Sequence, residues 1–214
     1  FKYTCVAIEK YKKPTEKIVV VGAGAAAFRF IQNYREINTQ DEIVVFSNEK
    51  NPFYNRVLLP EYVTAELSWE QLLKIKEEAL AKLNITLQSE VAINQISTDK
   101  KKITDSNGVI HHYDTLILAT GSRPFVPENA QLHLPGRFTI RKKDDADRLR
   151  NYLEQTQLPP EEQHVVIVGG GLLGLELAAA LKHKKVKITI IQRASRLMER
   201  QLDRISSKLL AEEV

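Results

Sequence analysis

The sequence predicts an α/β fold in which two doubly wound, mostly parallel sheets are joined through a small antiparallel meander. Two glycine-rich turns, at residues 22–27 and 169–174, carry this prediction, because each follows a short apolar strand and precedes a helical pattern. Short alternating segments around the turn dipeptide Asn107-Gly108 indicate the meander. The order strand, helix, strand therefore occurs twice in 214 residues.

The first half of the chain is expected to begin with a buried parallel unit. Its predicted elements are a strand at 18–21, a helix at about 25–36 and a strand at 43–46. Further along, Ser68 and Gln71 form a capping box, which predicts a helix that continues to about Leu83. Residues 1–16 form a Lys- and Tyr-rich arm with one weak strand at 3–8.

The middle and the second half follow the same logic. The alternating segments of the expected meander are 85–88, 91–96, 101–104 and 109–112. The elements expected after them are an apolar strand at 115–119, a helix at about 142–155, a strand from 165, a helix at about 172–182 and a strand at 187–191. We divide the chain into the arm (1–16), a first domain (17–140) and a second domain (141–214) that we expect to be truncated.

The composition restricts the functional class. A net charge of +4 is spread along the chain without a basic block interleaved with aromatic residues, so nucleic-acid binding is not predicted. One cysteine, Cys5, excludes an internal disulfide, a Cys-x-x-Cys redox pair and a cysteine-ligated cluster within this segment. No apolar run approaches the ~20 residues of a membrane span. We therefore expect a cytoplasmic protein with no membrane partner.

The first glycine-rich turn is predicted to bind the pyrophosphate of a dinucleotide. Gly22 permits a tight turn, and Gly24 lets the backbone approach phosphates at the start of the helix, beside Ala25 and Ala26. Glu49 follows the second strand at the place expected for a ribose partner. The alternative is a small-residue packing turn with a surface glutamate.

The second turn has all three glycine positions filled, by Gly169, Gly171 and Gly174, and its helix starts at Leu172-Leu173. The ribose position, counted forward, falls on Gln192, which lacks the negative charge that repels the 2′-phosphate of NADPH. Arg193 follows it and is either an attractant for that phosphate or a solvated surface residue. Glu176 either complements the helix dipole or lies near a nicotinamide.

Together these residues resemble the two-dinucleotide-binding-domain flavoprotein family, the FAD- and NAD(P)-dependent pyridine nucleotide oxidoreductases. The segment 113–124 contains Ala119-Thr120-Gly121, which is similar to the Ala-Thr-Gly motif of that family. The resemblance implies that the first turn binds FAD and the second binds NAD(P)H. It also makes Arg56 a candidate FAD contact, with a solvated loop arginine as the alternative, and we include Val91 and Ala92 among the cofactor-binding residues.

Two stretches, 54–59 and 197–203, are similar to the large subunit of assimilatory NAD(P)H nitrite reductases. Without the family, the second stretch would be read as the start of a surface helix. Glu61 departs from the pattern, because some reductases of the family keep a lysine near the flavin there. The family's Gly-Asp motif and the cysteines that ligate iron–sulfur centres and sirohaem are absent from these 214 residues, so we expect the chain alone to be inactive.

The resemblance implies an electron-input module that passes a hydride from NAD(P)H to FAD and electrons onward to a metal centre, as in nitrite reductase. The partners would be downstream iron–sulfur and sirohaem domains or a small electron carrier. The alternatives are a stand-alone rubredoxin- or ferredoxin-type reductase and a non-enzymatic flavin-binding redox sensor. No catalytic side chain and no metal ligand is predicted, since the cofactors carry the chemistry.

Overall fold

The computed structural model describes residues 15–213, except for the side chain of Glu77. The predicted strand at 3–8 and Cys5 lie outside this range. The chain forms two compact units, one comprising the residues up to Phe53 together with Ile75–Gly121, the other Tyr54–Lys74 together with Ser122–Val214. The segment 54–74 lies inside the predicted first domain but belongs to the second unit.

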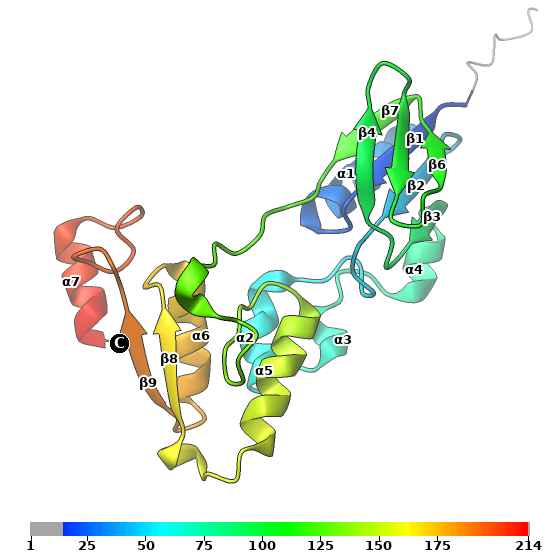
Figure 1. Ribbon diagram of the computed structural model, residues 1–214. Helices are drawn as coiled ribbons and strands as arrows, with labels where there is room; N and C mark the ends of the chain where they lie inside the picture. Colours follow the sequence, from blue (N-terminus) through cyan, green and yellow to red (C-terminus); the bar gives the residue numbers. More distant parts are fainter. Residues whose placement is uncertain (1–14, 214) are drawn as a thin grey trace, which may run out of the picture. The chain divides into compact units, whose positions relative to one another are not determined.

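The first unit is built on a parallel sheet whose spatial order is β3-β2-β1-β7. Its strands are β1 (Lys17–Val21), β2 (Glu42–Phe46), β3 (Ile85–Gln88) and β7 (Thr115–Leu118) (Figure 1). The helix α1 (Ala25–Ile37) follows β1, and its buried face joins the central strands in one hydrophobic core. Burial on both faces explains the continuous β-branched runs of the two central strands. The α/β prediction is therefore confirmed.

The antiparallel meander is present but smaller than predicted. It contains β4 (Ile93–Ser97), β5 (Lys102–Asp105) and β6 (Ile110–His112). The prediction that residues 85–88 belong to the meander is wrong, because β3 pairs in parallel with β2. Alternate residues of β3 are exposed, since it lies at the edge of the parallel sheet, and such alternation looks the same in an edge strand and in a meander.

The helix predicted from Ser68 to about Leu83 is interrupted. The capping box is confirmed, because the side chain of Gln71 accepts the backbone N–H of Ser68 at 2.8 Å. The helix α3 (Trp69–Leu72) then ends at once, because Leu73 is extended and pairs with Tyr54 in an antiparallel bridge. A separate short helix, α4 (Glu77–Ala81), precedes β3.

The second unit contains a two-stranded parallel sheet and several helices. Its elements are the 3-10 helix η1 (Arg56–Leu58), α2 (Leu59–Val63), α3, η2 (Glu128–Ala130), α5 (Lys143–Gln155), η3 (Pro160–Glu162), β8 (His164–Val168), α6 (Leu172–Lys182), β9 (Lys187–Ile191) and α7 (Arg204–Glu213). Side chains of α2, α3, α5 and α6 form its core, with Leu72, Ala146 and Leu181 fully buried.

The stretch 197–203 is not the start of a helix. Met198 adopts a left-handed backbone with φ of 50°, which a continuing helix does not allow. The helix α7 begins only at Arg204, where the carboxylate of Asp203 accepts the N–H of Ser206 at 2.8 Å and so caps the first turn. In the described part of the chain, no helix is long and apolar enough to cross a membrane.

Candidate functional site

The first glycine-rich turn connects β1 to α1 and is closed by tight backbone contacts. Gly22 has φ of +106°, a conformation that side chains disfavour, and its N–H donates to the carbonyl of Phe46 at 2.8 Å. A Cβ on Gly22 would lie 2.2 Å from the carbonyl oxygen of Ala119. Only glycine fits between the end of β1 and the end of β7.

The start of α1 offers a cradle for an anion. Gly24 is the N-cap, no side chain caps the helix, and its first turn holds no acidic residue. A Cβ on Gly24 would meet no atom within 4 Å, so the space above the turn is open. Ala25 and Ala26 are exposed at this end. Free N–H groups and the positive end of the helix dipole favour a phosphate at such a terminus.

The Ala119-Thr120-Gly121 segment lies at the same edge of the sheet as this turn. The N–H of Ala119 donates to the carbonyl of Val21 at 2.8 Å, which extends the pairing of β1 and β7 by one residue. Gly121 follows with φ of +71°, where the chain turns away from the sheet. The two motifs of the first unit, far apart in sequence, are thus brought together by parallel pairing.

The predicted ribose residue Glu49 lies in the loop after β2, at the carboxyl end of the sheet. Its N–H donates to the hydroxyl of Ser47 at 3.1 Å, and its side chain is half-buried. The N–H of Val91 donates to the carbonyl of Ser47 at 2.8 Å, which places Val91 and Ala92 beside the same loop. The structure therefore gathers these predicted contacts at one edge, where open α/β sheets bind ligands.

The second turn, between β8 and α6, presents a similar cradle. Gly171 is the N-cap of α6 without a side-chain cap, and a Cβ on it would meet no atom within 4 Å. Leu172 and Leu173, at the first positions of the helix, are 52% and 56% exposed. A Cβ on Gly174 would lie 2.1 Å from the carbonyl oxygen of Gly169, so the helix packs on the turn too closely for any side chain.

The loops that follow β2 and β9 return to their turns in the same way. The matching backbone hydrogen bonds are Gly22 N–H to Phe46 and Gly169 N–H to Ile191 at 2.8 Å, then Phe53 N–H to Ala23 and Met198 N–H to Gly170 at 2.9 Å. Phe53 and Met198 are both left-handed, with φ of 53° and 50°. The loops 47–52 and 192–197 therefore have equal length and can be aligned residue by residue.

This alignment changes which residue of the second loop occupies the position of the ribose-binding acid. The residue that matches Glu49 is Ala194, whereas Gln192 matches Ser47. The side-chain oxygen of Gln192 accepts the N–H of Gly170 at 2.9 Å, so Gln192 supports the turn. Arg193 is exposed. Neither Gln192 nor Ala194 supplies a carboxylate for a ribose.

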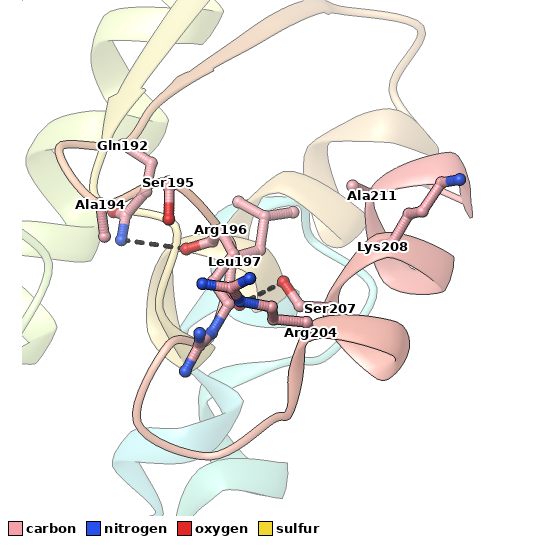
Figure 2. A pocket seen from close by; sticks show the side chains of 9 residues that line it. All are labelled: Gln192, Ala194, Ser195, Arg196, Leu197, Arg204, Ser207, Lys208 and Ala211. Carbon is pink, nitrogen blue, oxygen red and sulfur yellow. Dashed lines mark hydrogen bonds between the residues drawn. The ribbon is translucent and has the colours of Figure 1, made fainter.

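A pocket on the second unit, missed by the sequence reasoning, lies beside this loop. It has a volume of about 470 Å³ and is lined by Gln192, Ala194, Ser195, Arg196, Leu197, Arg204, Ser207, Lys208 and Ala211 (Figure 2). Leu197 is tied to α7, because the hydroxyl of the buried Ser207 donates to its carbonyl at 2.7 Å. In the sequence, this pocket is indicated only by the basic residues within 193–208. Which of these basic residues line the pocket is decided by the fold.

Glu176, on the first turns of α6, shares a partly buried site with Glu61 of α2. Burial raises the pKa of the Glu176 carboxyl, and the negative charge of Glu61 raises it further. In the described part of the chain, one side-chain oxygen of each glutamate is buried without a hydrogen-bond partner. Glu61 thus places a second carboxylate near Glu176, at a position where some reductases of the two-dinucleotide-binding-domain flavoprotein family have a lysine.

Arg56 lies in the second unit and is not a solvated loop residue. Its guanidinium donates to the hydroxyl of Tyr54 at 2.7 Å and to the carbonyl of Arg141 at 3.1 Å, and it lies 4.6 Å from the centre of the Tyr54 ring. Its proposed contact with FAD stays a prediction. Within residues 15–213, no group of three or more His, Cys, Asp or Glu side chains could hold a metal ion.

Comparison with known proteins assigns the family. Residues 16–214 match the family described as pyridine nucleotide-disulphide oxidoreductase. The chain belongs to this family. It is 33% identical over 199 residues to the nitrite reductase [NAD(P)H] large subunit of Klebsiella oxytoca, covering 92% of this chain and 20% of that protein. It is 30% identical over 200 residues to the assimilatory nitrate reductase electron transfer subunit of Bacillus subtilis, covering 93% of this chain and 25% of that protein.

Among solved structures, the chain is similar to the covalent putidaredoxin reductase–putidaredoxin complex, with a TM-score of 0.85 and 25% identity. That match covers 92% of this chain and 47% of the matched chain. The chain therefore spans about half of this reductase structure and a quarter or less of the two relatives named above. The resemblance to the FAD- and NAD(P)-dependent flavoprotein family is confirmed.

Proposed function

We propose that this chain binds FAD at the first glycine-rich turn and NAD(P)H at the second, and that it passes electrons onward to a metal-centre acceptor, as in nitrite reductase. The observation that carries the proposal is the pair of open cradles at Gly24 and Gly171, each at the uncapped start of a helix that follows a parallel strand. Family membership supports the pair of cofactors. The relatives named as nitrite reductase and nitrate reductase subunits support the acceptor class.

The residues of the first unit fit the adenosine half of FAD. The free N–H groups at the start of α1 would hold its pyrophosphate, and the carboxylate of Glu49 would accept hydrogen bonds from its ribose. Gly22 packs the turn closely against Ala119 at the end of β7, a contact that does not depend on the cofactor. Preorganisation of this kind reduces the cost of binding.

The residues of the second unit fit the pyrophosphate of NAD(P)H in the same manner. Gly174 lets α6 pack close to its turn, and the side chain of Gln192 accepts the N–H of Gly170 in that turn. Bound FAD and NAD(P)H would supply the hydride and electron transfer, which no described side chain provides. The protein contributes binding and orientation.

The two cradles can be tested separately with a matched pair of variants. Gly24→Val and Gly171→Val each place a side chain in open space at an extended backbone position, so folding is expected to be preserved. Gly24→Val is expected to lower FAD affinity at least tenfold and leave NADH binding unchanged, and Gly171→Val is expected to do the reverse. Flavin absorbance after gel filtration and calorimetric titration with NADH measure the two affinities, and thermal unfolding checks the fold.

The assignment fails if both variants keep both affinities, or if each variant lowers both affinities equally. Stopped-flow bleaching of flavin absorbance by NADH and by NADPH in the intact protein then tests electron input. Absence of bleaching with bound FAD would favour the redox-sensor alternative.

The second candidate is a stand-alone reductase that delivers electrons to a small carrier. The likeness to a putidaredoxin reductase captured with putidaredoxin favours it. Reduction of a rubredoxin or a [2Fe–2S] ferredoxin, compared with reduction of nitrite, discriminates the two when both are measured with the intact protein to which this segment belongs. Nitrite reduction by the intact protein without an added carrier supports the nitrite reductase assignment.

A further inference from the structure

The hairpin turn between β5 and β6 is built around one buried carboxylate. Asp105, the last residue of β5, is 6% exposed. One of its carboxylate oxygens accepts the N–H groups of Asn107 and Val109, both at 2.9 Å, and the other lies 2.8 Å from Nε2 of His111. The hydrogen bond from His111 is the main reason why the pKa of Asp105 lies below its usual range, and burial opposes it. The carboxylate is therefore ionised at neutral pH and fixes the backbone of this turn.

Ser106, the next residue, holds Ala92 of the loop between β3 and β4 by two hydrogen bonds. The N–H of Ser106 donates to the carbonyl of Ala92 at 2.8 Å, and the N–H of Ala92 donates to the hydroxyl of Ser106 at 3.3 Å. These two residues stand one step beyond the last pair of β4 and β5, which is Ile93 with Asp105. In a regular antiparallel pair the second bond would reach a backbone carbonyl. A side-chain hydroxyl takes the place of that carbonyl here, so alanine could not make this contact.

The loop 89–92 is tied on its other side to the loop that carries Glu49. The N–H of Val91 donates to the carbonyl of Ser47 at 2.8 Å. The hydroxyl of Ser47 in turn accepts the N–H of Glu49 at 3.1 Å. Direct hydrogen bonds therefore connect Ser106 to the proposed ribose-binding loop, and all of them lie within the first unit.

His111 closes this network against the end of β2. Its ring lies edge-to-face on the ring of Phe46, with 4.8 Å between the centroids and 61° between the planes. Phe46 is 1% exposed and is the last residue of β2, immediately before Ser47. The contacts thus leave the end of β2, pass through two loops and the hairpin turn, and return to the same strand end. A closed network restricts each loop, because neither can move without breaking a contact.

The members of the network differ in how much they are expected to contribute to stability. Asp105 and Phe46 are buried, so loss of their contacts would destabilise the hairpin itself. Ser106 is exposed, and water can replace its hydrogen bonds at little cost. A role of Ser106 in positioning the loop can therefore be measured separately from a role in folding.

We propose that Ser106, held in place by Asp105 and His111, positions the loop 89–92, and through it Glu49, for the adenosine half of FAD. The inference rests on the proposed assignment of the first glycine-rich turn to FAD. The three residues of the hairpin are positioning residues that do not touch the cofactor, and they act by fixing the loops that do. Loops held in the bound geometry lower the cost of binding, because less motion is lost when the ligand is bound.

Titration of the intact protein, prepared without flavin, with FAD tests the proposal through the quenching of flavin fluorescence. Ser106→Ala should weaken FAD binding by roughly fivefold, as loss of about one net hydrogen bond predicts, and should leave the urea midpoint unchanged. Ser106→Thr keeps the hydroxyl and should restore the affinity. Amide hydrogen exchange at Ala92 should accelerate in Ser106→Ala alone. Ser97→Ala is the matched control, because Ser97 pairs with Lys102 at the opposite end of β4 and β5, and it should change none of these quantities.

A second pair of variants isolates the hydrogen bond of His111. His111→Phe keeps a ring against Phe46 but removes the donor to Asp105. His112→Phe changes the exposed neighbour and serves as its control. His111→Phe should weaken FAD binding and His112→Phe should not, so equal affinities of the two variants would contradict the role of His111.

A double-mutant cycle with Glu49→Gln tests the route. If Ser106 acts through the loop that carries Glu49, Ser106→Ala should weaken FAD binding by less than about twofold in the Glu49→Gln background. The same loss in both backgrounds overturns the proposal, as does a loss that Ser106→Thr does not restore. If the unmodified protein binds FAD and Ser106→Ala binds it equally well, only this inference fails. If the unmodified protein binds no FAD, the assignment of the first turn to FAD fails with it.

Discussion

The two glycine-rich turns share one backbone design and differ in what closes them. In both, the first glycine donates to the last residue of the second strand, and a left-handed residue of the following loop donates back to the turn. In the first turn the crowded glycine is Gly22, against Ala119 of the neighbouring strand end. In the second turn the glycine crowded by backbone is Gly174, against Gly169 of its own turn, whereas Gly170 is crowded by the side chain of Leu197. The same cradle is therefore braced by the sheet in one case and by its own helix in the other.

The largest effect is expected when the close packing of Gly22 against Ala119 is disrupted. Gly22→Ala would place a methyl group 2.2 Å from the carbonyl oxygen of Ala119 at φ of +106°, so overlap and backbone strain add. We expect a loss of roughly 3 kcal/mol or more in the free energy of unfolding. Urea denaturation measures the loss, and hydrogen exchange of β1 and β7 locates it.

The control for this prediction is the matching glycine of the second turn. Gly169 has φ of +118°, but a Cβ there would meet no atom within 4 Å. Gly169→Ala should cost only the strain, about 1–2 kcal/mol. Equal losses for the two substitutions would show that Ala119 does not brace the first turn.

The next effect concerns the third position, where the first turn has Ala27 and the second has Gly174. Ala27 is fully buried, so the first helix stands far enough from its turn to admit a methyl group. Gly174→Ala would place its Cβ 2.1 Å from the carbonyl oxygen of Gly169. We expect a loss of about 1–3 kcal/mol in stability together with weaker NADH binding, measured by urea denaturation and calorimetry. Unchanged NADH affinity would show that the packing of α6 on its turn does not contribute to cofactor binding.

The sequence was sufficient for the parts of this comparison that depend on local pattern. The strands, the two helices and the glycine turns follow from apolar runs and from residues that tolerate special backbone geometry. The placement of residues 85–88 failed, because an edge strand and a meander strand show the same alternation. The prediction of a continuous helix from Ser68 to about Leu83 was also wrong. The helix ends after Leu72 because Leu73 pairs with Tyr54, which is a tertiary contact.

The candidate site shows the same division. The cradles were predictable, since glycine spacing encodes them. The loop alignment that pairs Glu49 with Ala194 required the return hydrogen bonds of Phe53 and Met198, which no spacing rule contains. Likewise, four basic residues lie between Arg193 and Arg204, bounds included, and only the folded loop shows that Arg196 and Arg204 line the pocket.

A smaller effect is expected where the loops differ in side-chain support. Gln192 accepts the N–H of Gly170, whereas the matching Ser47 accepts the N–H of Glu49 within its own loop. Gln192→Ala should cost about 1 kcal/mol and loosen the second turn, because one N–H loses its partner. Ser47→Ala is the matched variant for the first loop. Hydrogen exchange at Gly170 reports the change, and unaltered protection there would contradict the bracing role of Gln192.

The smallest expected effect lies two residues beyond the third glycine position, where α1 has the exposed Arg29 and α6 has Glu176. Because burial and then Glu61 raise the pKa of Glu176 above 4.5, the folded chain holds this proton more tightly than the unfolded chain. The stability of the second unit should therefore fall as pH rises from about 4.5 through the raised pKa, and Glu176→Gln should remove that loss.

Thermal unfolding of the two proteins at pH 4 and pH 7 checks this sign. The midpoint of the Glu176→Gln variant should exceed that of the unmodified chain at pH 7, and the excess should shrink toward pH 4. Glu36→Gln removes a charge from an exposed position of α1 and controls for the change in net charge. A Glu176→Gln variant that is less stable than the unmodified chain at pH 7 would mean that a partner stabilises the ionised Glu176 carboxylate. The helices α1 and α6 would then differ in charge at this position, but the charge on Glu176 would not destabilise the fold.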